Sequence, residues 1–264
     1  MFVYCGNRNF NPFSQIDLEN IAIHDEEFWT YVFGLIASKN QEVYEYLTGF
    51  EYSNSHNIFL EAQPQVPYIE SEGNTHLDMA LGDIINRNSN NIATKSGIEL
   101  NLDSKNRTKQ VCFLETKFLS DIDTKTTNYV IRNQMERIID NLLHFNDGTN
   151  NIDFEPTFTL LTPRIFRETI GSRLYYYKFH EYDNAKHHNV SPVDMFVLKD
   201  GKKRKEFDAD LYQKNFKSLK MRWVTFEEIL LIAFSDISIA DVTKLNSTDE
   251  LWRKLLEEIK KEAE

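Results

Sequence analysis

An apolar run near the middle of the chain ends in a carboxylate and an ammonium group two residues apart. The run covers residues 111–118, Val-Cys-Phe-Leu-Glu-Thr-Lys-Phe, and is typical of a β-strand. Because side chains alternate between the faces of a strand, Glu115 and Lys117 are expected to point the same way. An acidic residue can hold a divalent cation, and a neighbouring lysine can hold or polarise a nucleophilic water. Taken alone, the pair is also typical of a surface ion pair at a strand end.

Two further strand-like runs supply more carboxylates. Residues 76–83 alternate between apolar and other side chains, which predicts a strand over residues 77–85 with Asp78 on one face. The opposite, apolar face consists of Leu77, Met79 and Leu81. The residues that follow Asp78 on its own face are small and leave room for an ion. A third run, residues 58–63, ends at a proline and places Glu61 on the same face as Phe59.

With these residues the chain resembles the PD-(D/E)xK nuclease superfamily, in which a glutamate, an aspartate on a strand and Glu-x-Lys on the next strand form a magnesium site. The residues that match these positions are Glu61, Asp78, Glu115 and Lys117. Gln134 with Arg137 matches the Gln-led motif that many members carry on the following helix. Leu77 replaces the proline that names the motif, as in many relatives. The order of elements is similar over most of the chain.

The resemblance implies a magnesium-dependent nuclease, with DNA favoured over RNA and an endonuclease favoured as its type. Asp78 and Glu115 would hold Mg²⁺ or Mn²⁺, Glu61 would complete the coordination, and Lys117 would position the attacking water. Oxygen ligands suit these ions and give no reason to expect zinc. Gln134 is expected to reach the substrate. Restriction or phage defence is the role that family analogy suggests.

Two alternatives stay open beside a DNA nuclease. One is an RNase, because nothing in the sequence distinguishes RNA from DNA. The other is a catalytically silent nucleic-acid-binding or scaffold protein with a nuclease-like fold. A silent member is expected to have lost Asp78, Glu115 or Lys117, and all three are present. This favours catalysis.

Composition and charge limit the class of protein. The 264 residues, 41% hydrophobic and 27% charged, are typical of a globular protein with a sizeable core. A net charge of −11 argues against a protein that coats nucleic acid by uniform attraction. The two cysteines, Cys5 and Cys112, form no disulfide framework, and no signal pattern or membrane-spanning run is present. We expect a cytoplasmic protein without a membrane partner, and the sequence leaves a homodimer open.

Positive charge is concentrated in residues 199–222, which contain nine basic residues and four acidic ones. The densest cluster consists of Lys202, Lys203, Arg204 and Lys205. We expect this cluster to bind phosphates, together with Arg137. A solvated helix preceded by a flexible basic turn is the alternative interpretation.

Hydrophobic periodicity and capping signals predict the elements that must position these residues. Helices are expected after an N-cap at Asp25, over residues 41–47 with Gly49 at the end, over residues 127–145, and at two capping boxes. The boxes are Thr225 with Glu228 and Ser247 with Glu250. Further strands are expected at residues 157–162, 174–180 and 194–198, and residues 86–110 are interpreted as an inserted polar loop.

The pattern of elements favours an α/β fold with a mixed central sheet flanked by helices, because helices alternate with strands only in the middle of the chain. The resemblance implies a restriction-endonuclease-like core with N-terminal and C-terminal helices. With no repeat or linker in view, one domain over residues 1–264 is expected. It would have a helical layer over about 20–50, a catalytic core over about 57–200 and a basic, helical part over 200–264.

Overall fold

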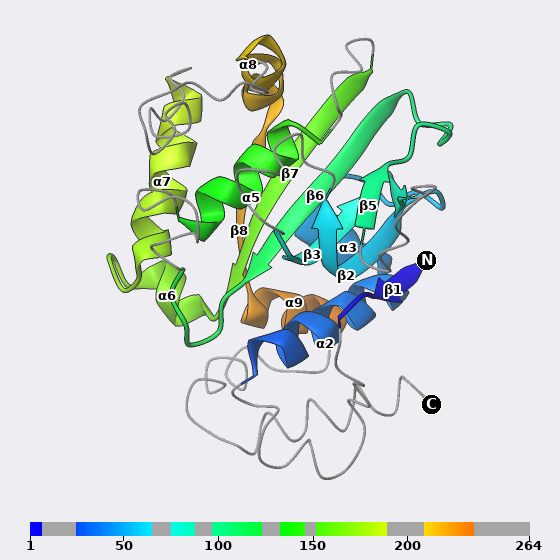
Figure 1. The fold of residues 1–264 in the computed structure, drawn as a ribbon. Coiled ribbons are helices and arrows are strands. Elements are labelled where there is room, and N and C mark those ends of the chain that lie inside the picture. Colours follow the sequence, from blue (N-terminus) through cyan, green and yellow to red (C-terminus); the bar gives the residue numbers. More distant parts are fainter. Residues whose placement is uncertain are drawn as a thin grey trace.

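The computed structural model describes residues 1–6, 25–64, 75–87, 97–122, 133–145, 152–188 and 209–234. They form an α/β fold in which a mixed eight-stranded sheet is flanked by helices (Figure 1). The strands are β1 (Phe2–Tyr4), β2 (Asn57–Pro64), β3 (Leu77–Gly82), β4 (Ile84–Asn86), β5 (Gly97–Leu100), β6 (Thr108–Thr116), β7 (Asp153–Thr162) and β8 (Lys220–Thr225). The helices are α2 (Glu26–Lys39), α3 (Gln41–Thr48), α5 (Gln134–Leu143), α6 (Arg164–Glu168), α7 (Leu174–His187), α8 (Ala209–Ser218) and α9 (Phe226–Ala233).

The strand order β4-β5-β2-β3-β6-β7-β8 places the antiparallel strands β2 and β3 next to three parallel ones. Strands β1 and β5 both pair with β2, on the side of β2 that faces away from β3. Thr116 at the end of β6 pairs with Leu161, and Thr162 at the end of β7 pairs with Thr225. The carboxyl ends of β6, β7 and β8 therefore meet at one edge, and β3 begins there because it runs the opposite way.

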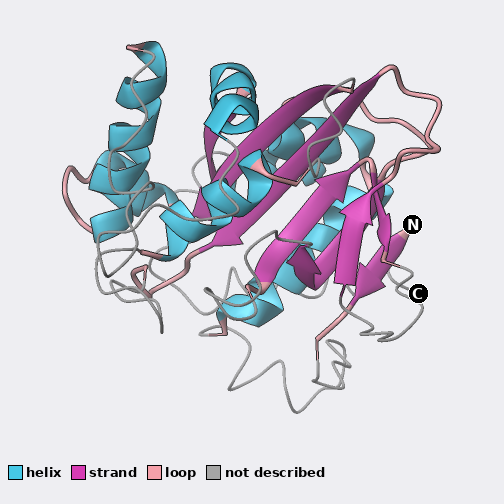
Figure 2. Ribbon diagram, turned by 45° about the horizontal axis from the view of Figure 1, so that its top comes forward, coloured by secondary structure: helices cyan, strands magenta, loops and turns pink. Residues whose placement is uncertain are grey.

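Two hydrophobic cores cover the two faces of the sheet, and Figure 2 shows helices on both sides. Helices α2, α3 and α9 pack on one face, where the rings of Trp29, Phe33 and Phe226 meet. Helices α5, α7 and α8 pack on the other face with side chains such as Ile138 and Phe216. Burial of these apolar side chains is the main driving force for the layered arrangement.

Several local predictions are confirmed by cap geometry. The Asp25 side chain accepts a hydrogen bond from the backbone N–H of Glu27 at the start of α2. Gly49 ends α3 in the left-handed conformation, with φ 72°. Thr225 and Glu228 form the expected capping box at α9. The strand containing Glu115 is confirmed, but β6 begins and ends earlier than predicted, so Lys117 and Phe118 follow it. The strand before Pro163 is confirmed and is longer than predicted.

Helix α7 corrects the prediction of a strand over residues 174–180. The aromatic run Tyr-Tyr-Tyr favours strands by propensity, but the buried residues Tyr175, Phe179 and Tyr182 follow helical spacing. The Asp121 carboxylate also accepts hydrogen bonds from the backbone N–H groups of Leu174 and Tyr175. This cap comes from a distant segment, so local sequence does not reveal it.

Other boundaries differ from the expectation. The strand expected after His76 breaks at Asp83 into β3 and β4, and the expected polar loop contains β5. The helix after Glu-x-Lys begins at Gln134, because Asn133 is its N-cap and forms a capping box with Glu136. Strand β1 was not predicted. The expected elements at residues 194–198 and 247–250, and residues 127–132 of the expected helix, lie outside the described residues.

None of the helices in the described ranges has the length and apolar character that crossing a lipid bilayer would require.

Candidate functional site: an acidic cluster with one lysine

The predicted carboxylates of β3 and β6 meet at the edge where β6 ends. Met79 pairs with Leu114 in the antiparallel register, which places Asp78 level with Glu115. The Asp78 carboxylate accepts a hydrogen bond of 2.7 Å from the backbone N–H of Thr116. Directly opposite residues on antiparallel strands share a face, so both carboxylates project from the same side of the sheet.

Lys117 lies between two carboxylates at this edge. Its Nζ atom is 2.8 Å from Glu115 Oε1 and 2.8 Å from Glu26 Oε1. The second oxygen of Glu26 accepts hydrogen bonds from the backbone N–H of Phe118 and the hydroxyl of Ser120. The amino end of α2 is therefore joined to the segment that leaves β6, and this segment holds the lysine in place.

One oxygen of Glu115 has no partner among the described residues. Its side chain is fully buried, and Oε2 accepts no hydrogen bond from the described residues. A buried carboxylate oxygen without a donor costs free energy, which a cation at that position would offset. Across the described ranges, no group of three or more His, Cys, Asp or Glu side chains is arranged to hold a metal ion. Mg²⁺ commonly uses only one or two carboxylates, with waters and substrate oxygens as the remaining ligands.

The ionisation of these groups reflects their burial and mutual charge. Burial raises the pKa of Asp78 well above its usual range, and the charge of Glu115 adds to this effect. Burial likewise raises the pKa of Glu115, although the ammonium of Lys117 opposes the shift. Burial lowers the pKa of Lys117, but Glu115, Asp78 and Glu26 outweigh it, so the net pKa is raised. Lys117 therefore stays protonated at neutral pH and is a fixed positive charge, not a proton acceptor.

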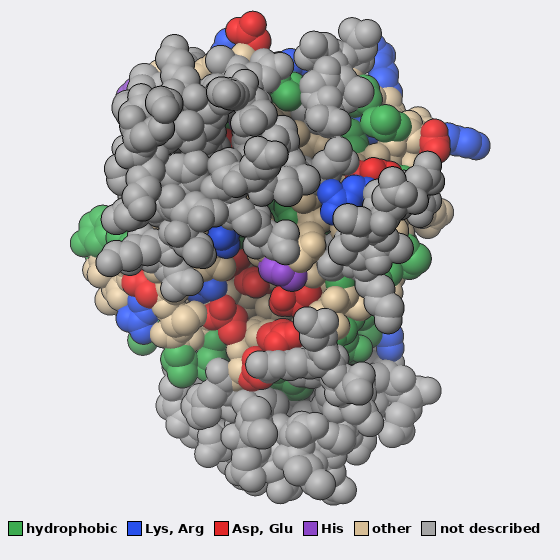
Figure 3. Space-filling model, viewed as in Figure 1, with side chains coloured by type: hydrophobic (Ala, Val, Ile, Leu, Met, Phe, Trp, Pro, Cys, Tyr) green, Lys and Arg blue, Asp and Glu red, His purple; other side chains and the backbone are tan. Residues whose placement is uncertain are grey.

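Glu26 was missed by the sequence analysis. Asp25, Glu26 and Glu27 form an acidic start of a helix, a pattern that the favourable interaction with the helix dipole explains without any further role. The only signal was that this helix must pack on the sheet. Figure 3 shows acidic side chains gathered around a hollow over the region where α2 begins in Figure 1, with Lys and Arg side chains beside it.

Glu61 lies in β2 at the level of Asp78, since Leu60 pairs with Met79 and Ala62 with Leu77. Its backbone is left-handed, with φ 53°, so the regular alternation of faces stops here. Phe59, Ala62 and Leu77 consequently belong to the same core, although alternation had assigned Leu77 to the face of Met79. Burial and the charge of Glu61 raise the pKa of Cys5 to about 11, which places Glu61 close to β1. The carboxylates that raise the pKa of Asp78 are Glu115 and Glu26.

The helix after Glu-x-Lys brings one predicted residue close to the site. The charge of Arg137 lowers the pKa of Glu115, opposing the effect of burial. Gln134 is half-buried in the first turn of α5, and within the described ranges no hydrogen bond joins it to the acidic cluster. The basic cluster Lys202, Lys203, Arg204 and Lys205 lies outside the described residues.

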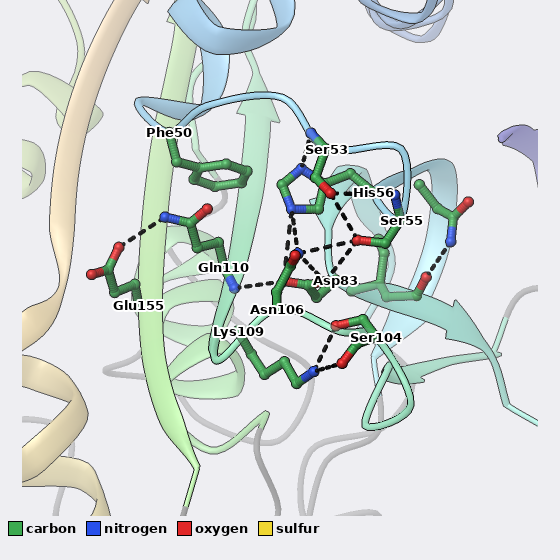
Figure 4. Close-up of polar contacts among 12 residues, drawn as sticks. Phe50, Ser53, Ser55, His56, Asp83, Ser104, Asn106, Lys109, Gln110 and Glu155 are labelled. Carbon is green, nitrogen blue, oxygen red and sulfur yellow. Dashed lines mark hydrogen bonds and ion pairs between the residues drawn. The ribbon is translucent and has the colours of Figure 1, made fainter.

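A second polar network surrounds Asp83, where β3 ends (Figure 4). The buried Asp83 carboxylate accepts hydrogen bonds from the Gln110 backbone N–H at 3.0 Å and from Asn106 Nδ2 at 2.9 Å. His56 Nε2 lies 3.7 Å from Asp83, and His56 Nδ1 accepts from the backbone N–H of Ser53. Ser, His and Asp are the residue types of a hydrolase triad, but no serine hydroxyl of the described residues is hydrogen-bonded to the 2% exposed His56. The network fixes the bend at Asp83.

The acidic cluster offers one protonated lysine and a carboxylate oxygen that no described residue pairs with, at the edge of the sheet where β6 ends. Such a site favours a cation and, through it, an anionic substrate. Searches for similar proteins found no family model, no curated protein and no solved structure that matches this chain.

Proposed function

We propose that this protein is a metal-dependent nuclease that hydrolyses phosphodiester bonds in DNA, with Asp78, Glu115 and Lys117 as its active-site residues. The mixed sheet would contain a restriction-endonuclease-like core, in keeping with the Glu-x-Lys resemblance. We further propose a cytoplasmic location and a role in restriction or phage defence. A homodimer is compatible with all of these.

The observation that carries the proposal is the Glu115 oxygen, next to Asp78 and Lys117, that no described residue pairs with. The half-buried Asp78 and the buried Glu115, both with raised pKa values, stand at the same level on neighbouring strands. Together with Glu26 they make three carboxylates, and the single ammonium group of Lys117 cannot neutralise all three. A divalent cation would complete this charge balance, and oxygen ligands suit Mg²⁺ or Mn²⁺.

Each residue then has a defined task. Asp78 and Glu115 would hold the cation, which when bound would stabilise charge on the phosphoryl oxygens and make the attacking water more acidic. Lys117, held protonated between Glu26 and Glu115, orients the attacking water and offsets the negative charge that develops as the bond to phosphorus forms. Glu26 positions Lys117 through its ion pair and its hydrogen bonds to the segment after β6.

A silent scaffold is the second candidate, and one observation favours it. Lys117 is engaged by two carboxylates, and the described residues contain no three-ligand group for a metal. The ion pairs of Lys117 with Glu26 and Glu115 would then serve only to hold α2 on the sheet, without any catalytic role.

Incubation with plasmid, linear duplex, single-stranded DNA and RNA, each with Mg²⁺, Mn²⁺ or EDTA, separates the candidates. A nuclease cleaves at least DNA, does so only with a metal, and loses this activity on Asp78→Asn. Cleavage of RNA alone would indicate the RNase. Absence of cleavage on every substrate would support the scaffold.

A further inference from the structure

The segments on either side of the acidic cluster form a second surface, which includes α6, the turn after it and the start of α7. β7 ends beside β6, so α6 begins next to the acidic cluster. Figure 1 shows the segment after β6 extending toward α6. The Asp121 carboxylate caps α7 and thereby attaches this segment to the helix. We call this surface the α6–α7 edge.

Arg173 is the cation of the α6–α7 edge whose charge is not offset by a carboxylate within the described ranges. Arg167 forms two hydrogen bonds to Glu228, and Lys178 lies 3.0 Å from Glu136. Arg173 forms no ion pair with a described residue. Its guanidinium lies over the ring of Phe166, with 4.5 Å between Cζ and the ring centroid.

The guanidinium of Arg173 is held in one orientation. Nη1 donates to the carbonyl oxygen of Ser172 at 2.8 Å, and Nη2 donates to that of Leu119 at 3.4 Å. These two bonds and the ring of Phe166 fix the plane of the group. Little side-chain entropy is then lost when the guanidinium binds an anion.

Arg173 is also close to the acidic cluster. Leu119, which it contacts, is two residues from Lys117, a span of at most about 7.6 Å between Cα atoms. The buried Tyr175 hydroxyl reports the same proximity: burial raises its pKa, and the charges of Arg173, Asp121, Glu26 and Lys117 all act on it. One buried oxygen thus lies within electrostatic range of both Arg173 and Lys117.

From this arrangement we infer that Arg173 binds a phosphate of the nucleic-acid strand beside the phosphodiester that lies at Lys117, an inference that rests on the proposed nuclease function. The acidic cluster repels a polyanion, so a strand that reaches it needs an uncompensated cation nearby. Arginine presents a planar fork of donors that fits phosphate oxygens. The α6–α7 edge and the segment after β6 also carry exposed apolar side chains that can contact sugar or base; they are Leu119, Ile165, Ile170 and Tyr177.

The test measures affinity against salt for Arg173→Gln. Anisotropy of a fluorescein-labelled DNA duplex, titrated in EDTA to prevent cleavage, gives the slope of log affinity against log salt. Loss of one phosphate contact should lower this slope by about 0.9, so the affinity ratio of parent to variant should shrink by about 3.5-fold from 50 to 200 mM salt. Arg173→Lys keeps the charge and should keep the parental slope.

The matched control is Arg107→Gln, which removes an exposed charge just before β6 begins, at the opposite end of that strand from Lys117. Its slope should equal that of the parent. If Arg173→Gln fails to fold, Arg173→Met still packs on Phe166 and replaces it in the test. If the parent cleaves DNA and Arg173→Gln has the same salt slope as the parent, the inference about Arg173 is wrong while the proposed function stands. A parent that neither binds the duplex nor cleaves any nucleic acid overturns the proposed function and the inference together.

Discussion

Replacing Glu115 with glutamine should abolish the response of the protein to Mg²⁺ or Mn²⁺. Glutamine keeps the size of the side chain but removes the charge of a buried carboxylate whose Oε2 atom accepts no hydrogen bond from the part of the chain that the structure describes. Hard divalent cations favour charged oxygen ligands, and Asp78 would be the only such ligand left at this level of the two strands.

The expected size of the response follows from the chain length. A cation present at 100 times its dissociation constant stabilises the folded state by about 2.7 kcal/mol. For 264 residues the entropy of unfolding is about 0.55 kcal/mol/K, since each residue contributes about 2.1 cal/mol/K. The Tm of the parent should therefore rise by about 5 °C, and that of Glu115→Gln should not rise.

Without metal, the direction of the pH dependence reverses the usual expectation for a carboxylate. Burial raises the folded-state pKa of Asp78 and Glu115. From about pH 4 up to the raised values, the folded protein binds more protons than the unfolded chain, so stability falls as pH rises through this window. Glu115→Gln has no carboxylate at this position and so does not lose the stability that ionisation of Glu115 costs. It should therefore be more stable than the metal-free parent at neutral pH.

Calorimetric melting of both proteins, with metal titrated at several pH values, measures these effects. Asp103→Asn is the control, because Asp103 is exposed and precedes β6 at its far end. The reasoning is refuted if Glu115→Gln gains as much Tm from the metal as the parent, or if the parent gains nothing.

Four other variants test separate parts of the argument. Lys117→Ala should keep the metal-induced rise in Tm but lose turnover by on the order of 10²-fold or more; a cleavage rate near the parental one would count against its role. Gln134→Ala should lower turnover without changing the Tm. A parental cleavage rate would show that Gln134 is a surface residue of the helix with no part in catalysis. Alanine at all of Lys202, Lys203, Arg204 and Lys205 should lower the salt slope of DNA binding by about one per lost contact, whereas an unchanged slope would indicate a solvated segment. Asp83→Asn should cost about 1.5–3 kcal/mol in chemical denaturation, because it removes a charged acceptor. Burial raises the pKa of Asp83, but the hydrogen bonds from His56 and the Gln110 N–H outweigh this effect, so the net pKa is lowered. The stability that Asp83→Asn loses should therefore become smaller as the pH falls through the lowered pKa of Asp83.

The part of the site that the sequence predicted depends on strand periodicity. Alternation along residues 111–118 placed Glu115 and Lys117 on one side, and the structure joins them by an ion pair of 2.8 Å. Asp78 came from the same kind of pattern, and the antiparallel register brings it to the level of Glu115. These predictions succeeded because Asp78 and Glu115 lie in neighbouring strands paired in antiparallel register, and Lys117 directly follows the last residue of β6.

The parts that were missed depend on contacts between distant segments. Glu26 reaches Lys117 across 91 positions, and nothing near residue 26 records this. Helix α7 takes its cap from Asp121, more than 50 positions earlier, so its aromatic run appeared to be a strand. The alternation of faces along β2 stops at Glu61, because the backbone of Glu61 itself is left-handed. In each case tertiary structure overrides a local preference.

The long separations within the acidic cluster also govern when the site comes into existence. Glu26, Asp78 and Glu115 are contributed by α2, β3 and β6, and the lysine that joins two of them follows β6. Closing loops of this length costs entropy before any contact compensates for it, so such contacts form late in folding. A nascent chain still ending before Lys117 carries the carboxylates without their counterion. If the protein is the proposed nuclease, hydrolytic capacity would therefore arise only once the central sheet has closed.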